Sequence, residues 1–355
     1  MSSTAATAAS PTELSERQAL TAYFAAKNRD CEVSLSDFKR SASGYSNETR
    51  LFTLNLVKAG FETRHPLVAR WAPLENRQFE HNDVAFQYHA MNALADTPVP
   101  VPRTVLLETD PAILGSRFFI MEQVAGDSTS DYPPGYHGAG FLHDASEKER
   151  EQVWWNALKV MADLHGVDWR TPKFRFLPTP EGGKAALQQR IDLMRALLKW
   201  SSDERIEPVE RAIDHLQTHM PSPSLLTLCW SDARPGNILF RDFQPAAALD
   251  WEGLHICAPE NDLAYFILVD EVAWRAHGQT RLSGLPTQEE TISRYEATTG
   301  RKVEDFDYYM LMQGTWLAIM MVINAKIVKA KGIIGFPEDF ATNNVSIARL
   351  KQLLP

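Results

Sequence analysis

The chain has 355 residues, 44% of them hydrophobic, and a formal net charge of −9. That length is enough for one large core or for two lobes. The acidic balance and the lack of any Lys/Arg run argue against a nucleic-acid or membrane partner. The three cysteines, Cys31, Cys229 and Cys257, are widely spread and lack metal-ligand spacing, so we expect a reduced protein of the cytoplasm.

The first third of the sequence predicts a helix followed by a small sheet. Residues 1–11 have neither the basic start nor the apolar core of a secretory signal, and we expect a disordered tail there. An amphipathic helix is predicted from Pro11 to about Asn28. Five strands are then predicted at 33–39, 49–56, 66–71, 104–108 and 117–124, with a helix at 79–94 between the third and the fourth.

The remainder is predicted to be mostly helical. Helices are expected at 145–165, 183–199, 204–219, 287–299, 303–329 and 339–353, and another begins near Asp262. Short apolar strands are predicted at 225–229 and 246–249. The apolar run 316–323 is too short to cross a bilayer and ends at Asn324 and Lys326, so we expect a buried helix there.

The two short strands flank the most informative segment, Trp-Ser-Asp-Ala-Arg-Pro-Gly-Asn at 230–237 followed by Leu-Asp-Trp-Glu at 249–252. Pro235 and Gly236 signal a turn, so a tight loop is expected from Asp232 to Asn237, and the second strand delivers Asp250 at its end. An Asp, an Asn five residues on and a second Asp thirteen residues further have the spacing of a protein-kinase-like catalytic loop and its metal-binding strand.

Phosphoryl transfer needs these residue types because the protein supplies mainly positioning and charge neutralisation. Asp232 fits the carboxylate that orients an acceptor hydroxyl and takes its proton. Asp250 and the amide oxygen of Asn237 are the hard ligands that Mg²⁺ prefers. Arg234 is a candidate cation for the transferring phosphate. Ordinary turn chemistry is the alternative, but the joint spacing between two apolar strands favours the functional interpretation.

On these residues the chain resembles the aminoglycoside phosphotransferase-like family, which is related to choline kinases. The likeness runs from about Ser36 to near the C-terminus and is strongest at 228–239, 248–252 and 259–265; it follows a branch with W-G-D-x-R-x-G-N…L-D-W-E in place of H-G-D. The resemblance implies an α+β, two-lobed protein-kinase-like fold. A nucleotide-binding lobe at 12–124 would hold an antiparallel sheet plus a helix, and a mostly helical catalytic and substrate lobe would span 125–355. It further implies ATP and Mg²⁺, with γ-phosphoryl transfer to a small-molecule hydroxyl acceptor.

The resemblance also assigns nucleotide contacts to the first lobe. A turn after the first strand would cover the ATP phosphates with N–H groups and hydroxyls, although its single glycine fits a plain hairpin turn about as well. Arg70 stands where kinases carry a phosphate-binding Lys, and Gln87 where the Glu partner of that Lys would be; an exposed strand Arg and a surface Gln are the alternative. The adenine would contact the main chain of a hinge after the fifth strand. The residues assigned to the nucleotide are Gly44, Tyr45, Ser46, Asn47, Arg70, Met121, Glu122, Gln123 and Val124.

Two departures from the family pattern bear on activity. Trp230 and Ser231 replace the His and Gly of H-G-D, and Arg70 with Gln87 replaces the Lys and Glu. An indole can take over the packing of the His, and neither the base nor a metal ligand is lost, so an active kinase is favoured. The alternative is a catalytically weak ATP-binding regulatory module. A metal-dependent phosphohydrolase is disfavoured, because Asn237 is not a carboxylate.

Several polar residues near the motif keep more than one interpretation. Glu252 either contacts a metal-bound water or pairs with a cation, the second being favoured. Asp262 is either a helix N-cap or first-turn residue or, by resemblance, an anchor for the catalytic-loop backbone. His165 ends a helix, where the helix dipole explains it as well as a family role does. Candidate acceptor-lining residues, equally well explained as surface or core, are Asp270, Glu271, Trp274 and Tyr308.

The acceptor is the least specified part of the prediction. Aminoglycosides give the family its name, whereas this branch is similar to kinase domains joined to acyl-CoA dehydrogenases, which suggests a hydroxyacyl thioester. The net charge of −9 is mildly unfavourable for an anionic coenzyme unless a local basic patch overrides it. An aminoglycoside-like compound and a hydroxyacyl compound therefore both stay open, and the oligomeric state cannot be predicted.

Overall fold

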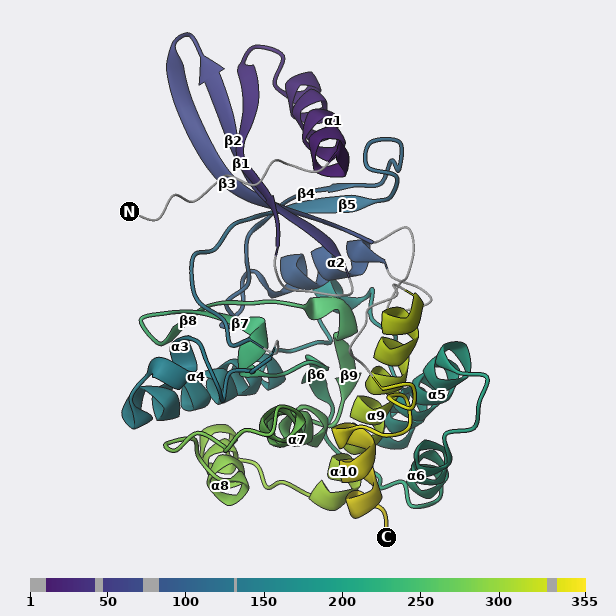
Figure 1. Cartoon of the computed structure of the whole chain (residues 1–355). Helices are drawn as coiled ribbons and strands as arrows, with labels where there is room; N and C mark the ends of the chain where they lie inside the picture. The colour runs from purple at the N-terminus through teal and green to yellow at the C-terminus, as the bar shows by residue number, and fades with distance from the viewer. Residues whose placement is uncertain (1–10, 42–46, 73–82, 131–132, 331–336) are drawn as a thin grey trace. The chain divides into compact units, whose positions relative to one another are not determined.

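The structure is a computed structural model that describes residues 11–41, 47–72, 83–130, 133–330 and 337–355 (Figure 1). The chain forms two compact units. The first comprises Met1–Tyr88 and Arg103–Gln123, and the second comprises His89–Pro102 and Val124–Pro355. Of the predicted tail, Pro11 is the first residue of a helix and 1–10 lie outside the described residues.

The first unit is a five-stranded sheet with a helix packed on it. The strands lie in the order β1-β2-β3-β5-β4, and every neighbouring pair is antiparallel. All five predicted strands are present, which confirms the predicted antiparallel sheet plus helix. The elements are α1 (Pro11–Lys27), β1 (Glu32–Arg40), β2 (Glu48–Lys58), β3 (Phe61–Trp71), β4 (Thr104–Glu108) and β5 (Phe118–Glu122); helix α2 (Val84–Leu94) begins in this unit and ends in the second.

Helix α1 is held to the sheet by an apolar face and one buried ion pair. Leu20 and Phe24 are at most 4% exposed and belong to one cluster with sheet residues such as Phe52. The Arg50 guanidinium, on β2, donates to both carboxylate oxygens of Glu16, at 2.7 and 2.9 Å. A bidentate pair of this kind satisfies a buried cation, so it fixes the register of α1 on the sheet.

Strand β3 begins five residues earlier than the predicted start at 66, because the β2–β3 hairpin is longer than its apolar pattern indicates. Its register continues to the pair Lys58↔Phe61 around Ala59 and Gly60, which have φ values of 50° and 83°. Residues 61–66 are exposed on both faces, so no apolar alternation marks them as a strand. The predicted start of α2 at 79–82 lies outside the described residues.

The second unit is mostly helical, as predicted, and contains two small antiparallel sheets, β6–β9 and β7–β8. Strands β7 and β9, of four and three residues, were not predicted. The elements are α3 (Phe141–Asp144), α4 (Glu147–His165), η1 (Pro172–Phe174), α5 (Gly183–Ser201), α6 (Glu207–Thr218), β6 (Thr227–Cys229), η2 (Pro235–Asn237), β7 (Ile238–Arg241), β8 (Gln244–Ala248), η3 (Trp251–Gly253), β9 (His255–Cys257), α7 (Glu260–Ala276), α8 (Gln288–Thr299), α9 (Phe306–Ala330) and α10 (Val345–Leu353).

Helix α9 forms the core of this unit. It has 25 residues, and the whole helix, unlike the apolar run 316–323 alone, is long and apolar enough to cross a membrane by length and composition. The predicted burial is confirmed, since 72% of its apolar window is buried and α9 packs against α5, α6, α7 and α10 (Figure 1). Burial of this extent is typical of a core helix.

Candidate functional site

The candidate catalytic loop joins two small sheets of the second unit. Buried strand β6 leads into it, η2 closes it, and the β7–β8 hairpin returns the chain beside it. Ile238 pairs with Ala248 in that hairpin, and the Leu249 N–H donates to the Asn237 carbonyl at 2.8 Å. Asn237 and Asp250 therefore sit at matching ends of two paired strands, which is how thirteen residues of sequence separation become a local arrangement.

The carboxylate of Asp232 is held by three donors. Nδ2 of Asn237 donates to Oδ2 at 2.6 Å, while Nε of Arg234 and the Tyr265 hydroxyl donate to Oδ1 at 2.9 and 2.5 Å. The Asp232 side chain keeps 31% of its surface exposed. A carboxylate oriented on one side and open on the other is suited to receive a proton from a bound hydroxyl.

Asn237 presents its amide oxygen away from Asp232. Nδ2 donates to both the carbonyl and the carboxylate of Asp232, at 2.9 and 2.6 Å. Because both of those groups are acceptors, the nitrogen must face them, and Oδ1 accepts no hydrogen bond from the described residues. Asp250 follows β8 in the left-handed region, with φ 63°, and is half-buried. Oδ1 of Asn237 and the Asp250 carboxylate are the donor types that Mg²⁺ prefers, so the predicted pair fits this ion.

Arg234 folds back over its own loop. A Cβ added at Gly236 would lie 2.7 Å from a terminal nitrogen of Arg234, so the absence of a side chain at 236 makes room for the guanidinium. The Arg234 side chain is 19% exposed and its Nε is committed to Asp232. Its predicted contact with a transferring phosphate stays a prediction.

Two tryptophans fix the backbone that precedes Asp250. The indole N–H of Trp251 donates to the Ala248 carbonyl, and that of Trp230 to the next carbonyl, of Leu249, both at 2.9 Å. The two rings stack with centroids 4.8 Å apart and an interplanar angle of 14°. Trp230 thus provides a hydrogen bond as well as the predicted packing, and it ties the loop of Asp232 to the strand of Asp250.

Asp262 anchors the loop from behind, which confirms the role that the resemblance implies. Its carboxylate is fully buried and accepts the backbone N–H groups of Trp230 and Ser231 at 2.5 and 3.0 Å. Nε2 of His165 lies 3.3 Å from the same carboxylate. The N-cap of α7 is Pro259 and Asp262 lies in the first turn of the helix, so of the two local interpretations the first-turn one is confirmed and the N-cap one is wrong. His165 lies in the last turn of α4, as the helix-end interpretation requires, and it also makes this buried contact.

Ser231 has a backbone conformation that normally favours glycine. Its φ is 78°, which costs a non-glycine residue on the order of 1 kcal/mol. The Asp262 carboxylate holds its N–H, and a Cβ added at Gly253 would lie 2.6 Å from the Ser231 Cβ. Glycine at 253 therefore leaves the space that the serine side chain uses.

In the first unit, the structure describes most of the residues predicted to bind the nucleotide. Asn47 is buried, whereas Gly44, Tyr45 and Ser46 lie outside the described residues. Arg70 is half-buried on β3. Gln87 is 2% exposed, so the alternative of a surface Gln is wrong. Both side chains have interaction partners, and the orienting role of Gln87 stays a prediction.

The predicted hinge has part of its main chain already engaged. The N–H of Glu122 donates to the Arg103 carbonyl at 2.8 Å, and the N–H of Gln123 donates to the Pro66 carbonyl at 3.0 Å. Met121 is buried on β5, and the Glu122 side chain forms an ion pair with Arg103. Val124 is the first residue of its segment in the second unit, and its N–H makes no backbone hydrogen bond in the described chain.

Comparison with known proteins matches this arrangement to one family. The model of the phosphotransferase enzyme family matches residues 37–291. This range includes Arg70, the predicted hinge after β5 and the whole candidate loop. The chain belongs to the phosphotransferase enzyme family. Its aminoglycoside phosphotransferase-like, protein-kinase-like fold is the one that the sequence predicted.

Solved structures agree with this fold. A crystal structure from Ralstonia eutropha assigned as an aminoglycoside phosphotransferase superposes with a TM-score of 0.67 at 24% identity, covering 95% of each chain. A thermostable mutant of aminoglycoside phosphotransferase APH(4)-Ia, in a ternary complex with ADP and hygromycin B, gives 0.60 at 15% identity, covering 95% of this chain and 98% of that one. At these identities the likeness shows the fold alone.

The curated relatives that this phosphotransferase-family chain matches include proteins named as acyl-CoA dehydrogenase family members. Acyl-CoA dehydrogenase family member 10 of Mus musculus is 26% identical over 237 residues, or 63% of this chain and 21% of that protein. Family member 11 of Homo sapiens is 24% identical over 281 residues, or 75% of this chain and 32% of that protein. The chain thus spans between a fifth and a third of the length of these relatives.

Tyr265 was not identified from the sequence, although its hydroxyl contacts the candidate base. It lies three residues after Asp262 on α7, and residues at that spacing share one helix face. The sequence therefore contained a signal for Tyr265. If Asp262 in the first turn of the helix anchors the loop, the residue one turn later on the same face also lies beside the loop. The short contact and 7% exposure make Tyr265 a positioning residue for Asp232.

Buried thiols and imidazoles behind the loop support it rather than react. His165, Cys229 and Asp262 offer ligand atoms within 4.8 Å of one another. Burial raises the pKa of Cys229 well above its usual range and that of Cys257 to about 12. Metal binding needs a thiolate, so these pKa shifts oppose it. Burial also lowers the pKa of His255 to about 3, which keeps that imidazole neutral.

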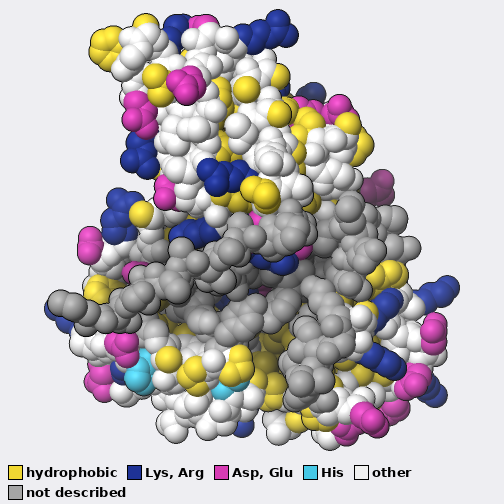
Figure 2. Space-filling model, turned by 45° about the horizontal axis from the view of Figure 1, so that its top comes forward, with side chains coloured by type: hydrophobic (Ala, Val, Ile, Leu, Met, Phe, Trp, Pro, Cys, Tyr) yellow, Lys and Arg dark blue, Asp and Glu magenta, His cyan; other side chains and the backbone are white. Residues whose placement is uncertain are grey.

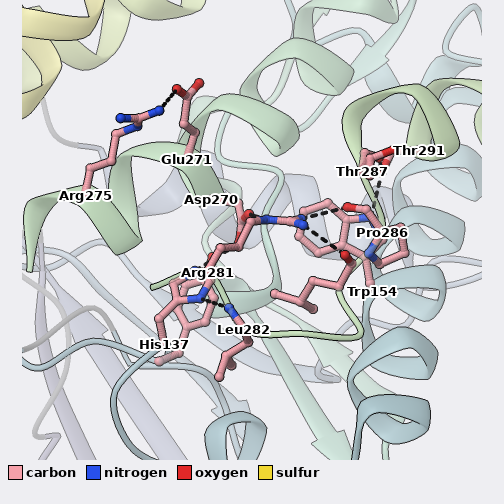
Figure 3. Close-up of polar contacts among 12 residues, drawn as sticks. His137, Trp154, Asp270, Glu271, Arg275, Arg281, Leu282, Pro286, Thr287 and Thr291 are labelled. Carbon is pink, nitrogen blue, oxygen red and sulfur yellow. Dashed lines mark hydrogen bonds and ion pairs between the residues drawn. The ribbon is translucent and has the colours of Figure 1, made fainter. Parts of the chain in front are cut away.

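Asp270, a candidate acceptor-lining residue, is instead the centre of a structural network (Figure 3). The Tyr136 hydroxyl and Nε2 of His137 contact Oδ1 at 2.6 and 3.1 Å, and Nε of Arg281 contacts Oδ2 at 2.7 Å. The Leu282 N–H donates to Nδ1 of His137, so the proton of that ring is on Nε2. Asp270 thus joins α7 to two loops and has no oxygen left for a ligand.

Replacing Asp270 with Asn is expected to lower the free energy of unfolding at neutral pH by about 3 kcal/mol, because Arg281 loses its buried counter-charge. Burial alone would raise the pKa of Asp270, but the His137 and Tyr136 hydrogen bonds and the Arg281 charge hold it below its usual value. A carboxyl whose pKa is lower in the folded than in the unfolded protein stabilises the fold at pH values above its unfolded pKa, which is near 3.9. This stabilisation is lost as the pH falls through the pKa of the folded state. Urea titrations from neutral pH to about pH 2 should show the two proteins converging below about pH 4. Asp214→Asn, at a side chain 79% exposed, is the control; a constant difference at all pH values would contradict the assignment.

Trp230→Phe keeps an aromatic ring but removes the indole donor to Leu249. A buried carbonyl is left unsatisfied, so the free energy of unfolding should fall by about 1–3 kcal/mol. Trp155→Phe is the matched control, because that indole donates to Glu151 in an exposed setting. Equal effects of the two substitutions in chemical denaturation would show that the Trp230 hydrogen bond does not hold the strand.

Proposed function

We propose that this chain is an ATP- and Mg²⁺-dependent kinase that moves the γ-phosphoryl group to a hydroxyl of a small molecule. The observation that carries the proposal is the position of Asp232. Its carboxylate is oriented by Asn237, Arg234 and Tyr265, stays partly exposed, and belongs to a loop tied to the strand of Asp250. Membership of the phosphotransferase family and the fold shared with nucleotide-bound aminoglycoside phosphotransferases support it.

In the proposed reaction, Asp232 accepts a hydrogen bond from the acceptor hydroxyl and takes its proton as that oxygen bonds to the γ-phosphorus of ATP. The bond from this phosphorus to the β,γ-bridging oxygen breaks at the same centre, and ADP leaves with that oxygen. Asn237 Oδ1 and the Asp250 carboxylate would hold Mg²⁺, which neutralises charge on the phosphate oxygens. Tyr265 keeps the Asp232 carboxylate in one orientation, which limits the motion of the reacting oxygen. Electrostatic placement of this kind is the main source of rate in phosphoryl transfer.

The first unit would supply the nucleotide contacts. Arg70 is the proposed phosphate cation, with Asn47 and the turn before it over the phosphates. The adenine edge would meet carbonyls at 122–124 and the N–H of Val124, because the N–H groups of Glu122 and Gln123 already have partners. The side chains at 122 and 123 would then contribute little to nucleotide specificity. The Glu122 side chain is in fact engaged in an ion pair with Arg103.

A catalytically weak ATP-binding module is the second candidate. It is favoured by the buried amide of Gln87, which cannot give Arg70 the charge of a carboxylate. Ser231, in contrast, is compatible with the loop, since Asp262 accepts its backbone N–H. Incubation of the pure protein with γ-labelled ATP, Mg²⁺ and a panel of hydroxyl compounds separates the two: label on an acceptor establishes the kinase, and ATP binding without turnover establishes the module.

Two acceptor classes remain candidates. Hygromycin B and streptomycin are the small molecules bound in the solved structures of family members, and the curated relatives carry acyl-CoA dehydrogenase names. We propose a small-molecule alcohol of one of these classes, aminoglycoside-like or hydroxyacyl. We also propose the cytoplasm as the compartment, since Cys31, Cys229 and Cys257 are free thiols.

Asp232→Asn should lower turnover by about 10²-fold or more and leave ATP affinity nearly unchanged, because the amide cannot take a proton. Steady-state ADP release measures turnover, and calorimetry measures ATP binding. Asp242→Asn is the matched control, an exposed Asp on the β7–β8 turn. Normal turnover by Asp232→Asn would refute its assignment as the base.

Asp250→Asn should weaken binding of Mg·ATP as well as turnover. Asn tolerates the left-handed backbone at this position, so the change removes the charge of a metal ligand and little else. We expect turnover to recover in part at raised Mg²⁺ concentration, whereas turnover of Asp232→Asn should not respond. An ATP affinity equal to that of the wild type at every Mg²⁺ concentration would contradict the metal assignment.

A further inference from the structure

One edge of the β2–β3 hairpin has no neighbouring strand in the described part of the chain. Strand β3 pairs with β2 along its whole length, from Phe61 to Trp71. On its other side it pairs with β5, but only from Leu67 onward. The hairpin therefore extends beyond β5 (Figure 1), and residues 61–66 are all exposed. Residues 61–65 of β3 are here called the free edge.

The main-chain groups of Glu62 and Arg64 point outward from the free edge. The carbonyl of Pro66 accepts the N–H of Gln123 at 3.0 Å, so it points toward the β5 side of β3. Residues two apart in a strand direct their main-chain groups to the same side, which places those of Arg64 and Glu62 on that side as well. Pairing with a further strand ends at Pro66, because proline has no N–H and its carbonyl already has a partner.

The free edge lacks the protection that the opposite edge of the sheet has. Strand β1 has a shift in register between Ser36 and Lys39 and a positive φ at Asp37, and such bulges interrupt pairing with another chain. The β2–β3 register, in contrast, runs unbroken to the pair Lys58↔Phe61. Phe61 also keeps 80% of its surface exposed. An added strand therefore fits the free edge better than it fits β1.

The charges of the free edge identify a partner that fits it. Its sequence is Phe-Glu-Thr-Arg-His, so Glu62 and Arg64 lie symmetrically about Thr63. If two copies pair antiparallel with Thr63 on a two-fold axis, Glu62 of each copy is opposite Arg64 of the other. These are the residues with outward main-chain groups, so each such pair also exchanges two hydrogen bonds. Phe61 and His65 are then opposite each other on the other face of the ribbon.

We infer that this protein forms a two-fold symmetric dimer in which the free edges of two copies pair antiparallel around Thr63. The inference is independent of the proposed kinase function. The free edge runs from the turn at Ala59 and Gly60 to Pro66, so its middle residue is also the centre of the charge pattern. Because β1 is interrupted, the pairing closes as a dimer and does not continue into a filament.

The same charges exclude the neighbouring registers. A shift by one residue sets outward main-chain groups of one copy against inward groups of the other, so the hydrogen bonds are lost. A shift by two residues places Glu62 opposite Glu62, or Arg64 opposite Arg64, and like charges directly opposite are destabilising. Within the described residues Glu62 forms no ion pair, and Arg64 forms only an exposed one with Asp37, at 3.7 Å. Both side chains can therefore pair across the dimer.

Long-range attraction contributes little to this association. In Figure 2, basic and acidic side chains alternate over the described residues of the face in view without forming a broad field of one sign. The net charge of −9 opposes the approach of two copies. The attraction comes from main-chain hydrogen bonds and two local charge pairs in a short interface, smaller than that of a stable complex. We therefore expect a weak dimer, with a dissociation constant on the order of 0.1 mM.

Charge reversal at the free edge, followed by sedimentation of the full chain, tests the dimer. The wild type should dimerise between about 10 µM and 1 mM. Glu62→Arg and Arg64→Glu should each remain monomeric, because like charges meet in both pairs. An equimolar mixture of these two variants should form a mixed dimer, since opposite charges meet again. Glu32→Arg, at an exposed position on β1, is the control and should associate like the wild type.

The mixture separates lost association from misfolding, because a misfolded variant would not associate when its counterpart is added. A wild type that stays monomeric up to about 1 mM would overturn the inference. Single variants that dimerise as strongly as the wild type, or a mixture that stays monomeric, would overturn it as well. A dimer that Glu32→Arg abolishes would move the contact to β1 and refute the free edge.

Cysteine cross-linking tests the register. Residues on the two-fold axis, at a position without hydrogen bonds, have Cα atoms about 4.5 Å apart, which a disulfide can span. In a Cys31→Ser background, which removes the one thiol that is not buried, oxidised glutathione should join two copies of Thr63→Cys. His65→Cys is the matched control, because residue 65 lies opposite Phe61 and away from its own counterpart. Cross-linking at 65 as fast as at 63 would refute the register around Thr63.

Discussion

The Asp262 carboxylate, buried behind the candidate loop, is the interaction on which the site depends. It accepts the N–H groups of Trp230 and Ser231, and so fixes the two peptides that precede Asp232. Because no solvent screens it, this charge can hold Ser231 at a positive φ that the residue would otherwise avoid. The position of Asp232 thus follows from a charge that cannot itself touch a substrate.

Helix α7 distributes this support along its length. Asp262 holds the loop backbone, Tyr265 holds the Asp232 carboxylate, and Asp270, two turns further, joins the loops of His137 and Arg281. Each contact uses a buried or half-buried group of the same rigid element. A shift of α7 would therefore move the loop backbone, the candidate base and the distal loops together.

The sequence predicted the elements better than the contacts between them. The five strands of the first unit and the helices of the second followed from apolar periodicity and turn residues. Strands β7 and β9 were missed because three or four residues give little periodic signal, whereas β6, equally short, lies in a longer apolar run at 225–229. Asp232, Asn237 and Asp250 were found because their spacing is set by one loop and one hairpin. Tyr265 was not, because its importance depends on a contact with Asp232, which is distant in the sequence.

Asp262 and Arg190 are buried charges with unequal support. Asp262 accepts two backbone N–H groups and lies beside His165. Its carboxylate therefore has protein partners and needs no ligand. Arg190, by contrast, is supported on one face only, by the ring of Trp316 on α9. Among the described residues it has no acceptor for its N–H groups. A protein that needed only packing there would gain stability from a Met or Leu.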